Sequence, residues 1–275
     1  MGAIIQFIQA DNIIAKTPNF VNVYYLLCYT GHMIALTKIA HRGASAYEPE
    51  NTMVSFQKAI DLHADMIELD VHLCQSGELV VTHDETVDRT TNGQGQVKLK
   101  TFTELESLTI RENEKIPLLQ EVINLTKGKC LLNVEIKNPV AAQMVIQLFR
   151  KNELKEINII SSNYVSVLKT VKKSGLPVQR ALVYYATKSD FRQTLFIIIS
   201  KLFWPVTKKI IIQRAIKSGV QWINLDKDLA TKKFVQKLKK LKFKVAVWVV
   251  NQPRHIKKLQ SYGVDAIMSD YPDRL

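Results

Sequence analysis

The chain is poor in cysteine: its 275 residues include only Cys28, Cys74 and Cys130. No two of them have CxxC spacing, so buried or surface thiols are their expected role. An odd, sparse set also excludes a disulfide framework, and a chain of this length can bury enough apolar surface to fold without one. These features are typical of a reducing compartment and predict a cytoplasmic location.

The N-terminal segment lacks the pattern of a signal peptide and that of a membrane span. Its first basic residue is Lys16, too late for the charged start of a signal peptide, and no cleavage pattern follows an apolar core. Its most apolar stretch, residues 21–36, has 16 residues and includes polar ones, whereas a spanning helix needs about 20. We expect residues 1–34 to be an appendage, with Met33 as an alternative start, and residues 35–275 to form one catalytic domain.

Acidic residues are scarce in the last part of the chain. Residues 201–275 contain 17 Lys and Arg against 5 Asp and Glu, whereas residues 1–200 contain 21 against 20. A basic surface of this kind is typical of proteins that approach a polyanion, either membrane phospholipid or nucleic acid. A solvated lysine surface without a partner would have the same composition, so composition leaves all three open.

Short β-rich runs alternate with helical patterns along most of the chain. The runs are nearly continuous in hydrophobic residues, as in strands buried on both faces of a parallel sheet. They span residues 36–40, 66–73, 78–83, 130–137, 157–162, 178–185, 222–226, 244–250 and 266–270. If 78–83 is a hairpin partner of the second strand, eight strand–helix units remain in about 240 residues, which predicts a single α/β domain with the (β/α)8 TIM-barrel fold. An open doubly wound sheet is the alternative, but its phosphate-binding glycine fingerprint is absent.

One segment breaks this alternation. Two helical stretches lie between the strands at 178–185 and 222–226, and the first, within 190–206, is apolar nearly all round. A helix on the outside of a barrel normally has one apolar stripe. The segment is therefore either packed on both sides or an interfacial membrane contact; the contact residues would then be Phe196, Phe203 and Trp204.

Carboxylates occur at alternate positions near the ends of two strands. Glu68 and Asp70 are one residue apart, and Glu135 and Lys137 repeat the spacing on a later strand. Because side chains alternate along a strand, each pair points to one side, which we expect to be the barrel interior. Three carboxylates at one mouth repel one another unless a cation joins them, and oxygen ligands favour Mg²⁺ or Ca²⁺ over zinc. Glu68, Asp70 and Glu135 are the predicted ligands of one divalent cation.

Basic residues and histidines end neighbouring strands. Arg42 and Lys137 add positive charge that a metal alone does not require, which indicates a phosphate ligand. His41 and His83 can exchange protons near neutral pH. Together with the carboxylates, they predict hydrolysis or transfer at a phosphate ester.

Other polar residues near these motifs are given structural roles. Glu50 precedes Asn51-Thr52, which is typical of the start of a helix with a capping residue. His72 shares the face of Glu68 and Asp70, and is expected beside the site without a direct role. Three aspartates that follow strands are interpreted as structural: Asp84, Asp226 and Asp270.

Five stretches resemble, in order, the signature blocks of the glycerophosphodiester phosphodiesterase family: HRGASAYEPENT, IELDVHLCQSGELVVTHDETVDRTTNG, LNVEIK, VAVWVVN and GVDAIMSDYP. The resemblance implies a TIM barrel and metal-dependent hydrolysis of glycerophosphodiesters to sn-glycerol 3-phosphate and an alcohol, in lipid and glycerol metabolism. It also implies the roles of single residues: His41 and His83 as an acid/base pair, Glu68, Asp70 and Glu135 as metal ligands, Arg42 and Lys137 as phosphate ligands, Asn51 as a brace for its own loop, and Trp248 as a wall for the glycerol.

Three other functions are compatible with the sequence: a lysophospholipase D that acts on membrane lysophospholipids with the same site, a phosphate-ester binding protein, and a nucleic-acid-binding module. The complete histidine and carboxylate set argues against binding without turnover. No nucleic-acid motif accompanies the basic charge, so no nucleic acid is expected as a partner. The expected partner is a small-molecule diester, with a peripheral membrane contact through 190–206 and the basic C-terminal third as a further option. The head group and the nucleophile, water or the adjacent glycerol hydroxyl, stay open.

Overall fold

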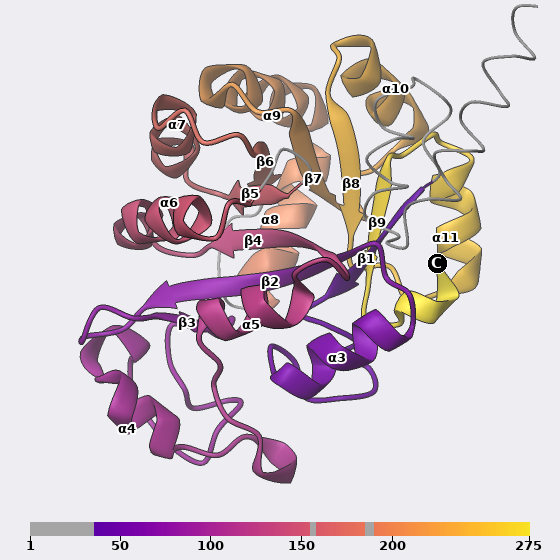
Figure 1. Ribbon diagram of the computed structural model, residues 1–275. Helices are drawn as coiled ribbons and strands as arrows, with labels where there is room; N and C mark the ends of the chain where they lie inside the picture. Colours follow the sequence, from indigo (N-terminus) through magenta and orange to yellow (C-terminus); the bar gives the residue numbers. More distant parts are fainter. Residues whose placement is uncertain (1–35, 155–157, 185–189) are drawn as a thin grey trace, which may run out of the picture.

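The computed structural model describes residues 36–154, 158–184 and 190–275 (Figure 1), so the predicted appendage at 1–34 lies outside the described residues. Nine strands belong to one sheet in this part of the chain. They are β1 Thr37–His41, β2 Met66–Leu73, β3 Leu79–Val81, β4 Leu131–Ile136, β5 Ile159–Ser162, β6 Gln179–Tyr184, β7 Trp222–Asp226, β8 Lys244–Trp248 and β9 Ala266–Ser269.

Eight of these strands close into a parallel barrel. The ring runs β1, β2, β4, β5, β6, β7, β8 and β9, and it closes because β1 pairs in parallel with both β2 and β9. β3 pairs antiparallel with β2 and lies outside the ring. The predicted TIM barrel is confirmed, and so is the extra hairpin strand after the second strand.

Helices follow the strands, and most of them cover the outside of the barrel (Figure 1). Their apolar stripes face the sheet, and Phe56, Phe149 and Phe234 are fully buried there. Between β3 and α5, short 3-10 turns and α4 form a small excursion with its own apolar cluster. The helices are α3 Met53–Asp61, α4 Phe102–Ser107, α5 Leu119–Thr126, α6 Ala142–Lys151, α7 Val165–Lys173, α8 Asp190–Leu202, α9 Trp204–Ser218, α10 Lys232–Lys240 and α11 Pro253–Gln260.

The interior of the barrel is apolar at one end and polar at the other. Inward-facing residues near the strand starts form a buried apolar cluster that includes Ile39, Met66 and Leu131. Two positions further along, the same faces of β1 and β2 carry His41 and Glu68. The carboxyl ends of the strands therefore meet in a polar mouth, where TIM barrels place their chemistry.

Two helices, α8 and α9, connect β6 to β7, as the sequence predicts. The inner side of α8 packs on the barrel: Ile197 is buried, and the ring of Phe196 lies 5.3 Å from that of Tyr184. The opposite side is open, with Leu202 74% exposed. The alternative of a helix packed on both sides is therefore wrong for the described residues. None of the helices in the described ranges has the length and apolar character needed to cross a membrane.

Candidate active site

Three buried carboxylates lie together at the mouth of the barrel. Glu68 and Asp70 come from β2 and Glu135 from β4, and the strand register places Asp70 opposite Glu135. Each is at most 7% exposed. One oxygen from each lies within 4.8 Å of the others. The structure thus brings together the three residues that the sequence predicts as ligands.

Two cationic side chains enter this cluster. Lys137 Nζ lies 2.9 Å from Asp70 Oδ1 and 3.0 Å from Glu135 Oε1. Arg42 Nε lies 3.3 Å from Asp70 Oδ2. The Lys137 side chain is only 6% exposed, so its charge is held against the carboxylates rather than in solvent. Both predicted phosphate-binding residues therefore lie at the carboxylate cluster.

Two carboxyls of the cluster have pKa values shifted in opposite directions. Burial would raise the pKa of Asp70, but Lys137 and the other nearby cationic groups outweigh it and hold that pKa well below its usual range. Glu68 has the opposite outcome: burial, and then the charges of Asp70 and Glu135, raise its pKa well above the usual value. A bound cation would relieve this repulsion, and an all-oxygen set of ligands fits Mg²⁺ or Ca²⁺.

The turn after β1 directs Arg42 into the site. Arg42 and Gly43 have φ of 56° and 84°, and a Cβ at Gly43 would overlap Ser55 of α3, so only glycine fits there. The Arg42 backbone N–H donates to Glu68 Oε2 at 3.1 Å, and Nη1 donates to Glu50 Oε1 at 2.9 Å. Burial would lower the pKa of Arg42, but the surrounding carboxylates raise it, so the guanidinium stays charged.

His41, the last residue of β1, is held by a carboxylate that follows β9. Its Nδ1 lies 2.7 Å from Asp270 Oδ1, and the other oxygen of Asp270 accepts from Asn251 at 2.6 Å. Burial and the neighbouring Arg42 lower the pKa of His41, while Asp270 opposes the shift. For Asp270, burial would raise the pKa, but the hydrogen bond and charge of His41 outweigh it and lower that pKa to about 2.

His83 has a matching carboxylate in the next residue. Its Nδ1 lies 2.6 Å from Asp84 Oδ1, and Arg89 Nε donates to Asp84 Oδ2 at 2.6 Å. Burial would raise the pKa of Asp84, but His83 and Arg89 lower it strongly. His72 contacts the His83 backbone, with Nε2 3.1 Å from the carbonyl oxygen. Both histidines also interact electrostatically with Asp70, so they flank the carboxylate cluster.

Three carboxylates at the site have roles beyond those that the sequence predicts for them. Asp270 and Asp84 are not simple structural carboxylates, because each holds the ring of a histidine. Glu50 does more than precede a helix: Arg42 and Arg89 both donate to its carboxylate. The pairing of Asp84 with His83 could be predicted, because the two residues are adjacent in the sequence. The sequence gives no sign that Arg89 contacts this site.

Asn51 and Trp248 also lie at the barrel mouth. Asn51 has φ of 58°, and its side-chain amide donates to Asp70 Oδ2 at 2.9 Å, so it braces a carboxylate. Thr52 then caps α3 through the backbone N–H of Ser55. Trp248 ends β8 at the barrel mouth and packs partly against the interior apolar cluster.

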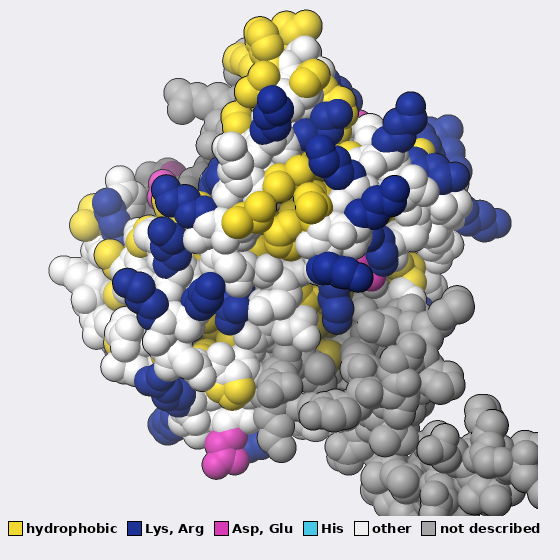
Figure 2. Space-filling view, turned by 90° about the horizontal axis from the view of Figure 1, so that it is seen from above, with side chains coloured by type: hydrophobic (Ala, Val, Ile, Leu, Met, Phe, Trp, Pro, Cys, Tyr) yellow, Lys and Arg dark blue, Asp and Glu magenta, His cyan; other side chains and the backbone are white. Residues whose placement is uncertain are grey.

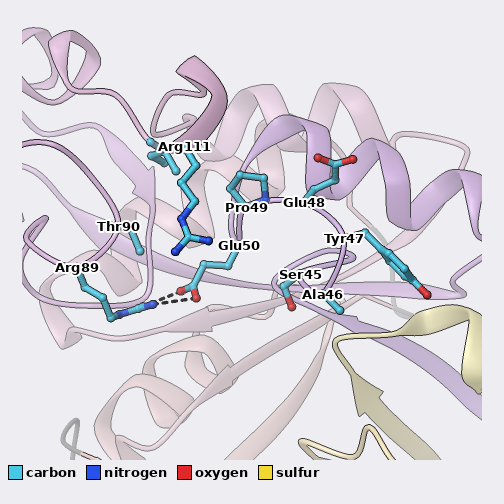
Figure 3. Close-up of a pocket in the computed structure, with 10 residues that line it drawn as sticks. Ser45, Ala46, Tyr47, Glu48, Pro49, Glu50, Arg89, Thr90 and Arg111 are labelled. Carbon is cyan, nitrogen blue, oxygen red and sulfur yellow. Dashed lines mark hydrogen bonds and ion pairs between the residues drawn. The ribbon is translucent and has the colours of Figure 1, made fainter.

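A pocket of about 290 Å³ adjoins the site on the side of the Glu50 carboxylate (Figure 3). Figure 3 shows Arg89 and Arg111 directed toward Glu50 from one side, with Ser45 and Tyr47 on the other. Ser45 also donates to Asp270 Oδ1 at 3.0 Å, so the wall of the pocket is shared with the His41 pair. Its lining residues are Ser45, Ala46, Tyr47, Glu48, Pro49, Glu50, Arg89, Thr90, Ile110 and Arg111.

Solved structures of phosphodiesterases have the same fold as this chain. The chain superposes on a phosphodiesterase from Oleispira antarctica, solved in complex with the product sn-glycerol-3-phosphate, with a TM-score of 0.72 and 25% identity over 86% of this chain and 93% of that one. A glycerophosphodiester phosphodiesterase from Thermotoga maritima has the same fold, with a TM-score of 0.67, 23% identity, and coverage of 88% and 97%.

Sequence relatives agree with the structural ones. A glycerophosphodiester phosphodiesterase from Caldanaerobacter subterraneus is 34% identical over 250 residues, which cover 86% of this chain and 95% of the relative. A human lysophospholipase D is 26% identical over 266 residues, 86% of this chain and 84% of its own. The model of the glycerophosphoryl diester phosphodiesterase family matches residues 41–274, which include every residue of the site described above. The chain belongs to the glycerophosphoryl diester phosphodiesterase family.

Proposed function

We propose that this protein hydrolyses glycerophosphodiesters to sn-glycerol 3-phosphate and an alcohol, as an enzyme of lipid and glycerol metabolism. The observation that carries the proposal is the grouping of two histidine–carboxylate pairs around a buried three-carboxylate cluster. Family membership and a structural relative with sn-glycerol-3-phosphate bound support a small glycerophosphodiester as the substrate.

One divalent cation, Mg²⁺ or Ca²⁺, is the cofactor that suits the site. Glu68, Asp70 and Glu135 would hold it, because buried carboxylate oxygens are the ligands that hard cations prefer. When bound, the cation would offset the negative charge that grows on the phosphate oxygens in the transition state. The same ligands suit both ions, so each is included in the assay below.

Arg42 and Lys137 would bind the phosphate oxygens of the substrate. Both are fixed by ion pairs with Asp70, so little side-chain freedom is lost when the substrate arrives. Trp248, at the end of β8, would form an apolar wall for the glycerol carbons. These three residues would orient the diester between the two histidines.

His41 and His83 would move the protons of the reaction. One would accept the proton of the attacking hydroxyl or water, and the other would donate a proton to the leaving alkoxide. In each histidine Nδ1 is engaged by a carboxylate, of Asp270 and of Asp84, which leaves Nε2 as the nitrogen for the reacting oxygens. The carboxylates would also stabilise each ring when it is protonated.

A panel of glycerophosphodiesters with different head groups, assayed for free sn-glycerol 3-phosphate with Mg²⁺ or Ca²⁺, tests the function. His41→Ala and His83→Ala should each lower turnover roughly 10²- to 10⁴-fold. His255→Ala on α11, a histidine outside the site, should leave turnover unchanged and serves as the matched control. Near-native turnover by either of the first two variants with metal bound would exclude the role given to that histidine.

A second candidate function is that of a lysophospholipase D with the same site. The exposed apolar side of α8 favours it, because a membrane contact would bring the enzyme to lysophospholipids, and one relative carries that name. Turnover of water-soluble diesters alone would count against it.

We propose that the protein is cytoplasmic and makes a peripheral contact with membranes, and that it has no nucleic acid as a partner. Within the chain, we propose residues 35–275 as the catalytic domain and residues 1–34 as an appendage.

A further inference from the structure

The exposed hydrophobic side chains of the protein are concentrated on one short segment. Half of the fourteen large hydrophobic residues exposed in the described chain lie in α8, in the first half of α9 and at the residue that joins them. They form what we call the α8–α9 ridge: Leu195, Ile198, Ile199, Leu202, Phe203, Val206 and Ile210. Single exposed apolar residues are ordinary, but a contiguous group of this size marks a surface that is covered by something else.

The ridge is held rigidly, so it is not a loose hydrophobic tail. Trp204 packs edge-on against Phe234 of α10, with ring centroids 5.1 Å apart, and Thr207 Oγ1 donates to the Ser200 backbone carbonyl at 3.0 Å. Phe196 and Trp204 face inward in these contacts, so of the three aromatic residues predicted to touch a membrane only Phe203 is exposed. The outward side chains are thus presented by a fixed scaffold.

Charge around the ridge is predominantly positive. No acidic residue occurs between Asp190 and Asp226, whereas this interval contains six basic ones. Lys208 lies over the Trp204 ring at 5.6 Å, and Lys209 follows it on α9. Figure 2 shows the molecule from above relative to Figure 1, which is the side on which α9 lies. Hydrophobic side chains on this face stand among many Lys and Arg side chains and few acidic ones (Figure 2). Apolar groups within a basic rim complement an anionic lipid surface.

The ridge lies at the same end of the barrel as the active site. α8 follows β6, and its Phe196 contacts Tyr184, the last residue of that strand. Lys201 pairs at 3.3 Å with Asp228, which follows the end of β7. Since the carboxyl ends of the strands form the catalytic mouth, a surface that covers the ridge also lies close to that mouth.

We propose that the α8–α9 ridge docks the protein on the surface of anionic phospholipid membranes, with its apolar side chains among the lipids and its lysines at the head groups. A protein that covered this basic rim would be expected to present acidic residues to it. A second copy of the chain docked through the same ridge would present none, because the ridge contains no acidic residue. The docking deepens the membrane contact proposed above, but vesicle binding requires no turnover, so it stands or falls independently of the proposed hydrolysis.

Sedimentation with vesicles of phosphatidylcholine and phosphatidylglycerol tests the proposal. The full chain should bind these vesicles, bind phosphatidylcholine vesicles more weakly, and release from the anionic ones as salt is raised. Leu202→Ser with Phe203→Ser should weaken binding roughly tenfold or more. Leu99→Ser with Leu241→Ser removes two exposed leucines elsewhere and should bind like the native chain. Circular dichroism of each variant checks folding without reference to activity.

Three results would overturn the proposal. One is the absence of vesicle binding by the native chain, and another is equal binding by the two double variants. The third is a dimer in lipid-free sedimentation that Leu202→Ser with Phe203→Ser dissociates, because the ridge would then be an interface between copies of the chain.

Discussion

Asp270→Asn should slow the reaction, because His41 loses the carboxylate that holds its ring while the histidine itself is retained. The substitution removes the carboxylate that lies 2.7 Å from His41 Nδ1. A hydrogen bond to a charged group contributes about 1.5–3 kcal/mol, and each 1.4 kcal/mol of transition-state energy is about tenfold in rate. We therefore expect kcat to fall roughly 10- to 100-fold.

The pH dependence of the rate separates this effect from general damage. Asp270 favours the protonated form of His41, so its loss lowers the pKa of His41, and the limb of the pH–rate profile that belongs to His41 moves to lower pH. Asp265→Asn is the matched control: it lies just before β9, at the opposite end of the strand that Asp270 follows, where it pairs with Lys239 at 2.7 Å. It should lower stability without moving the profile. An Asp270→Asn enzyme with native kcat and an unshifted profile would refute the pairing argument.

Three further predictions concern the residues that support the site. Asn51→Gly keeps the left-handed backbone but removes the amide that binds Asp70, so affinity for Mg²⁺ or Ca²⁺ in calorimetric titration should fall about 10- to 100-fold; unchanged affinity would contradict the bracing role. Arg89→Ala frees Asp84 and Glu50, and since Arg89 is half exposed kcat should fall only about two- to fivefold, with a larger loss pointing to substrate contact. Asp270 has a folded pKa of about 2 against an ordinary 3.8, so it stabilises the fold above about pH 4 by about 2 kcal/mol, and this is lost as pH falls toward 2. Urea unfolding of the native chain and Asp270→Asn should converge over that range, and a constant difference would contradict the shift.

The barrel and the carboxylate cluster could be predicted because both follow from local patterns. Strand periodicity puts Glu68 and Asp70 on one face regardless of the exact register, and parallel strands bring Glu135 to the same mouth. The strand count, with 78–83 set apart as a hairpin, then predicts a closed barrel rather than an open sheet. These inferences need no knowledge of which distant residues touch.

The partners of the histidines could not be predicted in the same way. His41 and Asp270 are 229 positions apart, and they meet only because β1 closes the ring against β9 in a particular register. The contact between Arg42 and Glu50 depends on the left-handed turn at Arg42, which points the side chains of these two residues into the site. Such contacts arise from the closed tertiary structure, and a single sequence carries no periodic signal for them.

The all-round apolar character of α8 illustrates a further limit. The hydrophobic pattern alone predicts either that α8 is packed on both sides or that it contacts a membrane. Only the structure distinguishes inward Phe196 from outward Leu202 and Phe203, because the rotation of a helix about its axis is set by its packing on the barrel.

Metal-dependent release of sn-glycerol 3-phosphate is the measurement that tests the account most directly. The native chain is depleted of divalent cations with a chelator, mixed with a glycerophosphodiester, and assayed before and after addition of Mg²⁺ or Ca²⁺. We predict no release without the cation, release on its addition, and no recovery by Glu68→Gln, which lacks one of the three clustered carboxylates. Equal release with and without the cation, or full recovery by Glu68→Gln, would contradict the proposed role of the carboxylate cluster.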